Sequence, residues 1–236
     1  MQELPLDIET TPKKVLITLC VVISALLSLN ILGMVSKFGF GHDQVYGLVA
    51  LFDLDVESNI PTFYSAFMLM VASILLGVIT YASKRVGEAW IAWGGLSLIF
   101  MFLAFDEIAS IHERLIGPMR SLMDATGFLR YAWVVPYGIA VVSITVLYSG
   151  FLLRLPRKTM KLFLLSGAIY VSGAIGFEML GGKYASLYTT QDLSFALICT
   201  VEETLEMIGV AVFIYSMLTY TIERFSSLRI SVGSKG

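Results

Sequence analysis

The chain alternates between long apolar stretches and short segments that contain charged residues. A helix needs about 20 predominantly apolar residues to cross the hydrocarbon core of a bilayer. Six stretches approach or exceed that length, so the pattern predicts an all-α, polytopic integral membrane protein built as one bundle of six transmembrane helices. The expected spans are 15–36, 61–82, 90–113, 131–153, 162–180 and 193–222.

Glycine and proline set several of the expected boundaries. Pro61 stands in the first turn of its helix, where a missing backbone N–H costs little. Gly117-Pro118 is expected to end the third helix, and Gly181-Gly182 to break the fifth. No repeat or low-complexity linker divides the chain, which indicates a single domain.

Composition agrees with residence in a membrane. The chain is 57% hydrophobic and 14% charged, whereas soluble domains carry about 25% charged residues. The net charge of −2 does not bear on nucleic-acid binding, but no basic stripe suggests it, so no nucleic-acid partner is expected. The lipid bilayer is therefore the first expected partner.

Basic residues predict the orientation. With six spans, both termini lie on one side, and that side holds 11 of the 16 Lys and Arg residues. Because Lys and Arg concentrate in cytoplasmic loops, both termini are expected in the cytoplasm, and a bacterial inner (plasma) membrane is the expected location. The eleven residues are Lys13, Lys14, Lys84, Arg85, Arg154, Arg157, Lys158, Lys161, Arg224, Arg229 and Lys235.

Carboxylates interrupt three of the apolar stretches. The last stretch contains three of them, and an ionised carboxylate inside a membrane costs roughly 2.5–3.5 kcal/mol on insertion scales. Counted from the charged cytoplasmic ends of their helices, Asp106, Glu178 and Glu206 each lie about 25–27 Å along the axis, at about 1.5 Å per residue. Three helices therefore place acids in one layer, in the outer half of the membrane.

A divalent metal ion is the expected occupant of this layer. Like charges in a poorly solvated site cannot all ionise, so either a cation neutralises them or several are protonated. Carboxylates with at most one imidazole suit Mn²⁺, iron, Ca²⁺ or Mg²⁺. The predicted metal ligands are Asp106, Glu178, Glu202, Glu203 and Glu206.

Glu178 and Glu206 are expected to form the central pair of the site. Both lie deeper than the interfacial end of the Asp106–Glu113 stretch. A row of small residues, Ala168, Ser172 and Gly176, recurs every four positions just before Glu178, and such spacing lets helices approach closely. It is expected to bring the fifth helix against the sixth.

His112 and Glu113 are the candidate catalytic residues, expected to transfer protons. On a continuous helix Asp106, Ser110 and Glu113 would stack on one face, and His112 would lie about 120° away from Asp106. The sequence leaves open whether His112 faces the site or the interface. The acidic segment 53–59 resembles a calcium loop but has Ser58 where an EF-hand needs Gly. A solvated loop that caps the next helix is the preferred interpretation.

Two functional hypotheses follow. The first is a metal-dependent membrane enzyme that acts on a lipid or another apolar substrate. The alternatives are a small cation- or proton-coupled transporter or channel, and a structural membrane subunit with protonated acids. The inner half of each span contains no acid, so no polar path crosses the membrane, and this favours the enzyme. Motifs of zinc proteases, phosphate-binding loops and serine hydrolases are absent.

Overall fold

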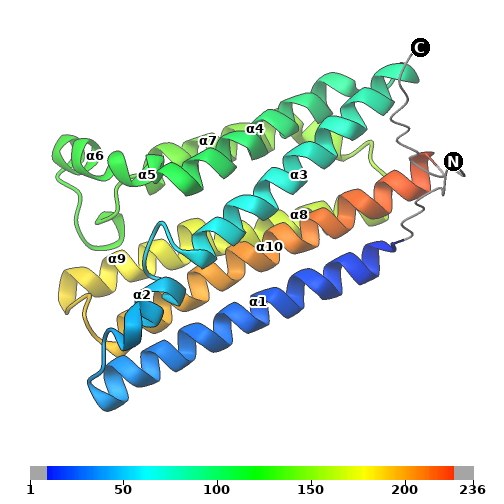
Figure 1. Ribbon diagram of the computed structural model, residues 1–236. Coiled ribbons are helices and arrows are strands. Elements are labelled where there is room, and N and C mark those ends of the chain that lie inside the picture. Colours follow the sequence, from blue (N-terminus) through cyan, green and yellow to red (C-terminus); the bar gives the residue numbers. More distant parts are fainter. Residues whose placement is uncertain (1–9, 226–236) are drawn as a thin grey trace, which may run out of the picture.

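The structure is a computed structural model that describes residues 10–225, and every regular element in that range is a helix. The helices form an elongated bundle in which long antiparallel elements lie side by side (Figure 1). The long elements are α1 (Pro12–Met34), α3 (Ile60–Arg85), α4 (Trp90–Ala109), α7 (Val134–Leu152), α8 (Arg157–Val171) and α10 (Leu193–Phe225). The short α-helices are α2 (Leu48–Phe52), α5 (Ile111–Arg114), α6 (Ile116–Met123) and α9 (Glu178–Leu187).

Five helical stretches are long and apolar enough to cross a membrane. They are Pro12–Gly39, Ile60–Arg85, Trp90–Ala109, Val134–Leu152 and Arg157–Leu187. The first continues α1 through a π-helical turn, Val35–Gly39, and the last joins α8 to α9 through a second π-helical segment, Ser172–Phe177. The prediction of an all-helical, membrane-embedded protein therefore agrees with the structure.

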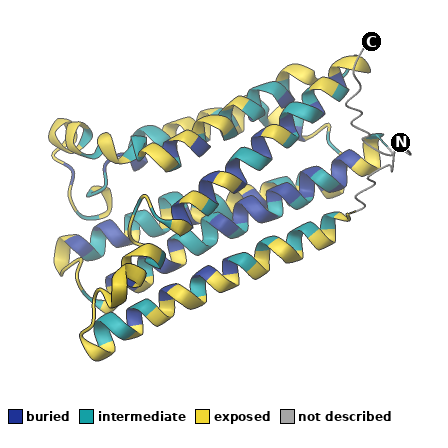
Figure 2. Ribbon diagram, in the orientation of Figure 1, coloured by how far each residue is buried: buried dark blue, intermediate teal, exposed yellow. Residues whose placement is uncertain are grey.

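Helix α10 lies at the centre of the bundle. It packs against α1, α3 and α8, while α3 packs in turn against α4. Buried residues concentrate on α3 and α10, whereas α1 and α7 expose most of their surface (Figure 2). Such exposed, apolar helix faces are expected where lipid is the solvent.

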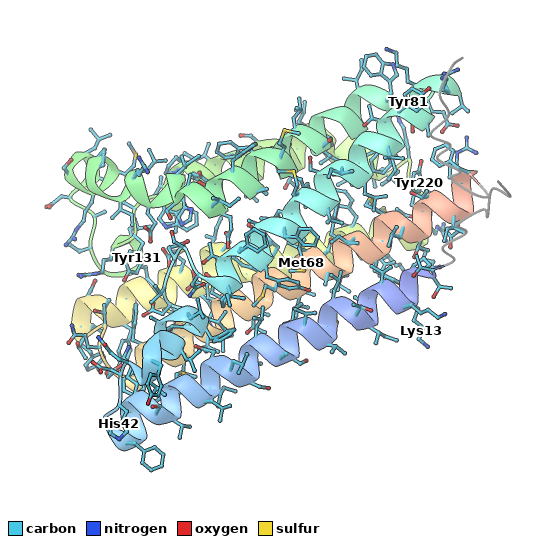
Figure 3. The ribbon with its side chains drawn as sticks, viewed as in Figure 1. Lys13, His42, Met68, Tyr81, Tyr131 and Tyr220 are labelled. Atoms are coloured by element: carbon cyan, nitrogen blue, oxygen red, sulfur yellow. The ribbon has the colours of Figure 1, made fainter. Side chains whose placement is uncertain are left out.

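The core fills the space where α3, α4 and α10 meet. Met68 and Leu76 of α3, Trp93 of α4 and Met217 of α10 are almost fully buried there. Met68 points from α3 toward α10, and Lys13 and His42 mark opposite ends of the α1 region (Figure 3). The first residue of α1 and the last of α10 lie at one end of the bundle, which we call the Pro12 end; α5 and α6 lie at the other, the α5 end.

Side-chain caps fix the start of α3 as the sequence predicts. The Asn59 side chain accepts a hydrogen bond from the Thr62 N–H (3.2 Å) and donates to the Asp53 carbonyl (2.6 Å). The first bond pairs a helix N–H that has no partner within the helix. The second ties the preceding loop to the same residue, so the loop has a defined path into α3.

Glycines bring α10 into backbone contact with α8 and with the π-helical segment that continues it. A Cβ atom on Gly173 would lie 2.7 Å from the Glu202 carbonyl oxygen, and one on Gly209 would lie 2.8 Å from the Tyr170 backbone nitrogen. Neither distance leaves room for a methyl group. The two helices can therefore approach this closely only with glycine at both positions.

The row of small residues predicted to make this contact does not make it. Ala168, Ser172 and Gly176 are exposed, and the neighbouring Gly173 faces α10 instead. The π-helical segment begins at Ser172, and its wider turn changes the face on which later residues lie. A constant α-helical period therefore gives the wrong contact face.

Gly181-Gly182 does not break the fifth helix, contrary to the prediction. Helix α9 continues through both glycines to Leu187. A Cβ atom on Gly182 would lie 3.3 Å from the Gly127 carbonyl oxygen and 3.2 Å from the Tyr131 ring. Gly182 thus allows the 127–131 segment to pack closely against α9.

Replacing Gly209 by Ala should destabilise the fold, because the new methyl group meets the backbone of Tyr170. Overpacking of this kind costs about 1–3 kcal/mol. The free energy of unfolding, measured by SDS titration in mixed micelles, should fall by that amount. Gly150→Ala is the matched control, since Gly150 is exposed on α7 and its Cβ would meet nothing within 4 Å. Equal stability of the two variants would contradict the glycine contact.

Candidate functional site

Helix α4 ends four residues earlier than the sequence predicts, and this break shapes the site. Ser110 adopts a left-handed conformation (φ 47°, ψ 48°), which ends α4 at Ala109 and starts the single turn of α5. A non-glycine residue pays about 1–2 kcal/mol for that conformation. The predicted stacking of Asp106, Ser110 and Glu113 on one continuous face is therefore wrong, because the helix on which it depends is interrupted.

Asp106 holds the chain after the break. Its Oδ1 accepts hydrogen bonds from the His112 N–H (2.8 Å) and from the Tyr137 hydroxyl (3.0 Å). Its Oδ2 lies 3.2 Å from His112 Nδ1. The carboxylate is almost fully buried, so these bonds offset the cost of removing its charge from water. Because Nδ1 faces Asp106, Nε2 is the ring nitrogen left to bind another group.

His112 turns into the interior, which settles the question that the sequence left open. Its ring lies 4.7 Å from the Trp133 ring, centroid to centroid, and lines the central cavity. Burial disfavours the charged imidazole, but the hydrogen bond to Asp106 and the charge of that carboxylate outweigh burial. The pKa of His112 is consequently raised above its ordinary value.

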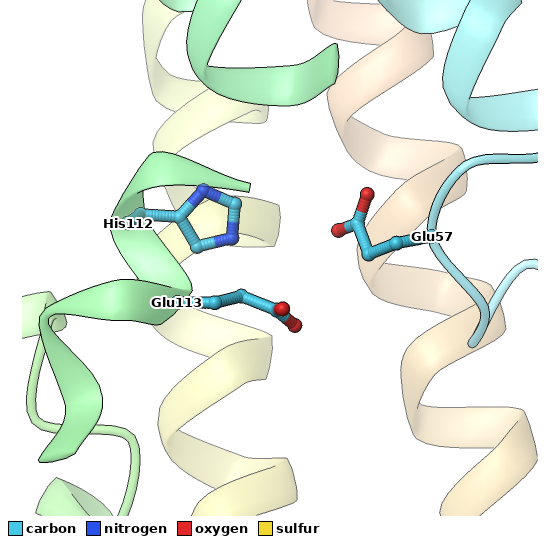
Figure 4. Close-up of side chains that lie close together, drawn as sticks. All are labelled: Glu57, His112 and Glu113. Carbon is cyan, nitrogen blue, oxygen red and sulfur yellow. The ribbon is translucent and has the colours of Figure 1, made fainter. Parts of the chain in front are cut away.

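Glu57, His112 and Glu113 converge on one point (Figure 4). One potential ligand atom from each residue lies within 4.8 Å of those of the other two. Glu57 Oε2 is buried and has no hydrogen-bond partner. Burial and, next, the nearby Glu113 raise the pKa of Glu57 above its ordinary value. A carboxylate oxygen left without a partner beside an imidazole and a second carboxylate can accept a metal ion.

The sequence predicts a solvated acidic loop before α3. In the structure this loop is not simply solvated. Its cap to α3 is confirmed, but Glu57 is partly buried, and both Glu57 and the more exposed Asp55 line the cavity. Periodicity within a loop carries no information about its tertiary path, which explains why these two residues were missed. Trp133 and Tyr137 also contact the acids, through hydrogen bonds to Glu178 and Asp106. Their four-residue spacing, which places them on one helical face, is the sequence signal that could have identified them.

One cavity of about 730 Å³ connects the candidate residues. Its walls come from α3, α4, α5, α7, α8, α9 and α10, from the π-helical segment between α8 and α9, and from the loop before α3. All seven residues that the sequence singled out line it: Asp106, His112, Glu113, Glu178, Glu202, Glu203 and Glu206. Asp55, Glu57 and Glu107 add three more carboxyl groups. The sequence thus identified most of the polar wall, although it did not identify Glu57.

Depth along the helices explains why distant acids meet. Glu88 and Arg224, from which the depths of Asp106 and Glu206 were counted, form an ion pair at the Pro12 end. The depths of Asp106 and Glu206 are therefore measured from the same level of the bundle. Asp106 and Glu206 reach the same cavity as a result.

The deeper carboxylates have different surroundings. Glu178 accepts a hydrogen bond from Trp133 Nε1 (2.7 Å) and its carboxyl group contacts that of Glu202. The Tyr170 hydroxyl lies beside Glu206. Two touching carboxyl groups need a proton or a cation between them. This part of the wall can therefore store protons or bind a cation.

Arg114 and Lys183, the basic residues nearest to the acids in the sequence, do not line the cavity. Lys183 lies over the Phe128 ring, with Nζ 5.6 Å from its centroid. Among the described residues that line the cavity, none is Lys or Arg. Neutralisation must come from protons or from a bound cation.

Removing the Asp106 carboxylate should destabilise the α5 end. Asp106→Ala deletes three contacts, so we expect a loss of about 1–3 kcal/mol in the free energy of unfolding. Asp106→Asn keeps the Oδ1 acceptor used by His112 N–H and Tyr137 and should lose less. SDS titration of both variants measures the difference, with Asp43→Ala in an exposed loop as the control. An Asp106→Ala variant as stable as the control would contradict this role.

Sequence similarity to a known family extends over the whole bundle. No curated protein and no solved structure matches the chain. One family match, residues 15–221, begins in the first turn of α1 and ends in the last turns of α10, so that it includes every helix described above. The chain therefore belongs to the family described as a domain of unknown function, DUF8692.

Proposed function

We propose that this protein is a metal-dependent membrane enzyme that acts on a lipid or another apolar substrate. One observation carries the proposal: a single cavity joins the Glu57–His112–Glu113 group at the α5 end to an apolar section between the helices. The apolar section is lined by Ile99, Leu103, Ile144, Phe163, Val210 and Phe213, among others. Concave apolar sites with a few converging polar groups are typical of small-molecule binding.

Glu57, His112 and Glu113 would hold the metal ion. Their atoms converge, one carboxylate oxygen lacks a partner, and Asp106 orients the His112 ring so that Nε2 is free. A carboxylate partner on the second ring nitrogen is the usual support for a metal-binding histidine. Two carboxylates and one imidazole favour Mn²⁺ or iron over Ca²⁺ and Mg²⁺. When bound, such an ion polarises a substrate oxygen or lowers the pKa of a water molecule.

This proposal exchanges two roles predicted from the sequence. His112 and Glu113, expected to transfer protons, hold the ion, and the deeper acids of α10 take over proton exchange with the substrate. Asp106 becomes a positioning residue. The five predicted ligands, Asp106, Glu178, Glu202, Glu203 and Glu206, form the second candidate metal set, because they line the same cavity without a basic partner there.

We further propose that α10 is a sixth membrane span, with both termini in the cytoplasm of a bacterial inner membrane. At about 1.5 Å per residue, its 33 residues extend about 50 Å, well beyond the hydrocarbon thickness of about 30 Å. The start of α1 and the end of α10 lie at the same end of the bundle (Figure 1). The basic residues of the sequence concentrate on that side.

A transporter is the less favoured function. The carboxyl groups line the cavity toward the α5 end, and the section toward the Pro12 end is lined mainly by apolar residues. A cation or proton crossing the membrane would have to pass this apolar section without polar partners, which is costly. An apolar substrate, by contrast, gains from it.

Protein purified in mild detergent should contain about one Mn or Fe per chain by elemental analysis. Glu57→Gln and His112→Ala each alter a proposed ligand and should lower metal affinity by more than about 10–100-fold, the loss typical when only a residue that hydrogen-bonds to a ligand is changed. Glu223→Gln, at the exposed Lys158–Glu223 pair, is the control and should retain full metal. Loss of metal from Glu178→Gln and Glu206→Gln alone would assign the ion to the deeper acids. Metal-free protein under all loading conditions would refute the enzyme proposal.

A membrane-impermeant maleimide should distinguish the two ends of the bundle in intact cells. In a background lacking Cys20 and Cys199, we expect cysteine at Asp124 to be labelled from outside and cysteine at Arg154 only after the membrane is opened. Both positions are exposed in loops at opposite ends of α7. Labelling of the Arg154 cysteine in intact cells would reverse the proposed orientation.

A further inference from the structure

The charge of the cavity wall discriminates between apolar substrates. Nine carboxyl groups and one imidazole line the cavity, and no described lining residue is Lys or Arg. A phosphate or carboxylate group entering this space finds no basic partner and meets like charge from the carboxyl groups that remain ionised. An ammonium group meets opposite charge from several helices. A single divalent ion at Glu57, His112 and Glu113 would not reverse this imbalance.

The volume of the cavity and the distribution of its lining residues fit one molecule with a polar end and an apolar chain. Its volume of about 730 Å³ lies within the range of about 300–1,000 Å³ that holds one small ligand. The carboxyl groups gather toward the α5 end, and the walls between α4, α7, α8 and α10 are mainly apolar. A molecule with one alkyl chain and one polar end matches this division.

Helix α7 leaves a lateral route into the cavity. It is joined to α4 by Tyr137–Asp106 (3.0 Å) and by the Tyr148 hydroxyl on the Ala92 carbonyl (3.2 Å). Within residues 134–171, no side-chain hydrogen bond or ring contact joins α7 to α8. Ala140 and Thr145 of α7 and Gly167 of α8 line the cavity and are also exposed. The cavity therefore reaches the apolar surface of the bundle between these two helices.

We infer that the cavity binds a single-chain amphiphile with an amine at its polar end, which enters from the bilayer between α7 and α8. This amphiphile is the substrate class of the proposed enzyme. Its turnover rests on the proposed function, whereas its binding does not. The ammonium group lies among the carboxyl groups of α10 and α4, and the chain fills the apolar section. Binding itself needs the cavity and its negative charge, not the metal.

The test measures binding of three amphiphiles with the same saturated chain and an amine, hydroxyl or carboxylate end. Full-length protein is placed in nanodiscs of neutral phospholipid, and bound amphiphile is counted by native mass spectrometry. The amine should bind about tenfold or more tightly than the carboxylate, with the alcohol between them. Equal binding of all three, or tighter binding of the carboxylate, would overturn the inference.

Two glycine variants separate cavity binding from partition into the lipid. Gly167→Phe places a ring at the cavity wall where an added Cβ meets nothing within 4 Å, so the fold tolerates it while the cavity is blocked. It should abolish the preference for the amine. Gly150→Phe, equally unobstructed but outside the cavity wall, should bind like the parent protein. Amine binding that survives in Gly167→Phe would contradict entry between α7 and α8.

Metal content measured on the same samples keeps the two proposals distinct. Amine binding to a protein that never holds a metal would uphold this inference and refute the metal-dependent enzyme. A stoichiometric metal without selective amine binding would do the reverse. The double variant Glu203→Gln/Glu206→Gln should reduce amine affinity several-fold and leave alcohol affinity unchanged, because only the charge of the wall has been altered.

Discussion

The backbone contact that α10 makes with α8 and with the π-helical segment after it is the constraint on which the rest of the structure depends. Gly173 lies against the Glu202 carbonyl, and Gly209 lies against the backbone of Tyr170. With its backbone fixed at these two points, α10 has one orientation about its own axis. That orientation directs Glu203 and Glu206 toward the cavity while the remaining faces of α10 pack against α1 and α3. The glycines therefore place the carboxylates as well as the helices.

Gathering the acids into one cavity changes the energetics of carrying them in a membrane. Each ionised carboxylate alone would cost roughly 2.5–3.5 kcal/mol on insertion scales. In one cavity, two neighbouring carboxyl groups can share a proton, and carboxylates from α4, α9 and α10 can bind one cation together. The free-energy cost of burying the carboxylates is then offset by their joint binding of a positive charge. The left-handed turn at Ser110 belongs to the same arrangement, because it directs His112 and Glu113 into the cavity at a backbone cost that the Asp106 contacts offset.

The sequence predicts the features that depend on length and depth, and misses those that depend on local departures from the α-helix. Apolar stretches identify the long helices, and depth counted from charged helix ends correctly places Asp106 and Glu206 in one cavity. The predicted row at Ala168, Ser172 and Gly176 fails because a π-helical segment starts within it. The break at Ser110 is missed because no glycine or proline marks it. Glu57 is missed because its position follows from the path of a loop, which only tertiary contacts determine.

The position of the candidate metal group relative to the apolar section bears on its chemistry. Glu57, His112 and Glu113 lie at one end of a space whose remaining walls are largely apolar. An alkyl chain that fills this space excludes water from the carboxyl groups beside its polar end. Charge interactions strengthen as water leaves. An alkyl chain in the apolar section therefore strengthens the binding of the reacting group by the polar section. Substrates with short chains would leave water in the cavity and lose this effect, so chain length would govern the chemical step as well as binding.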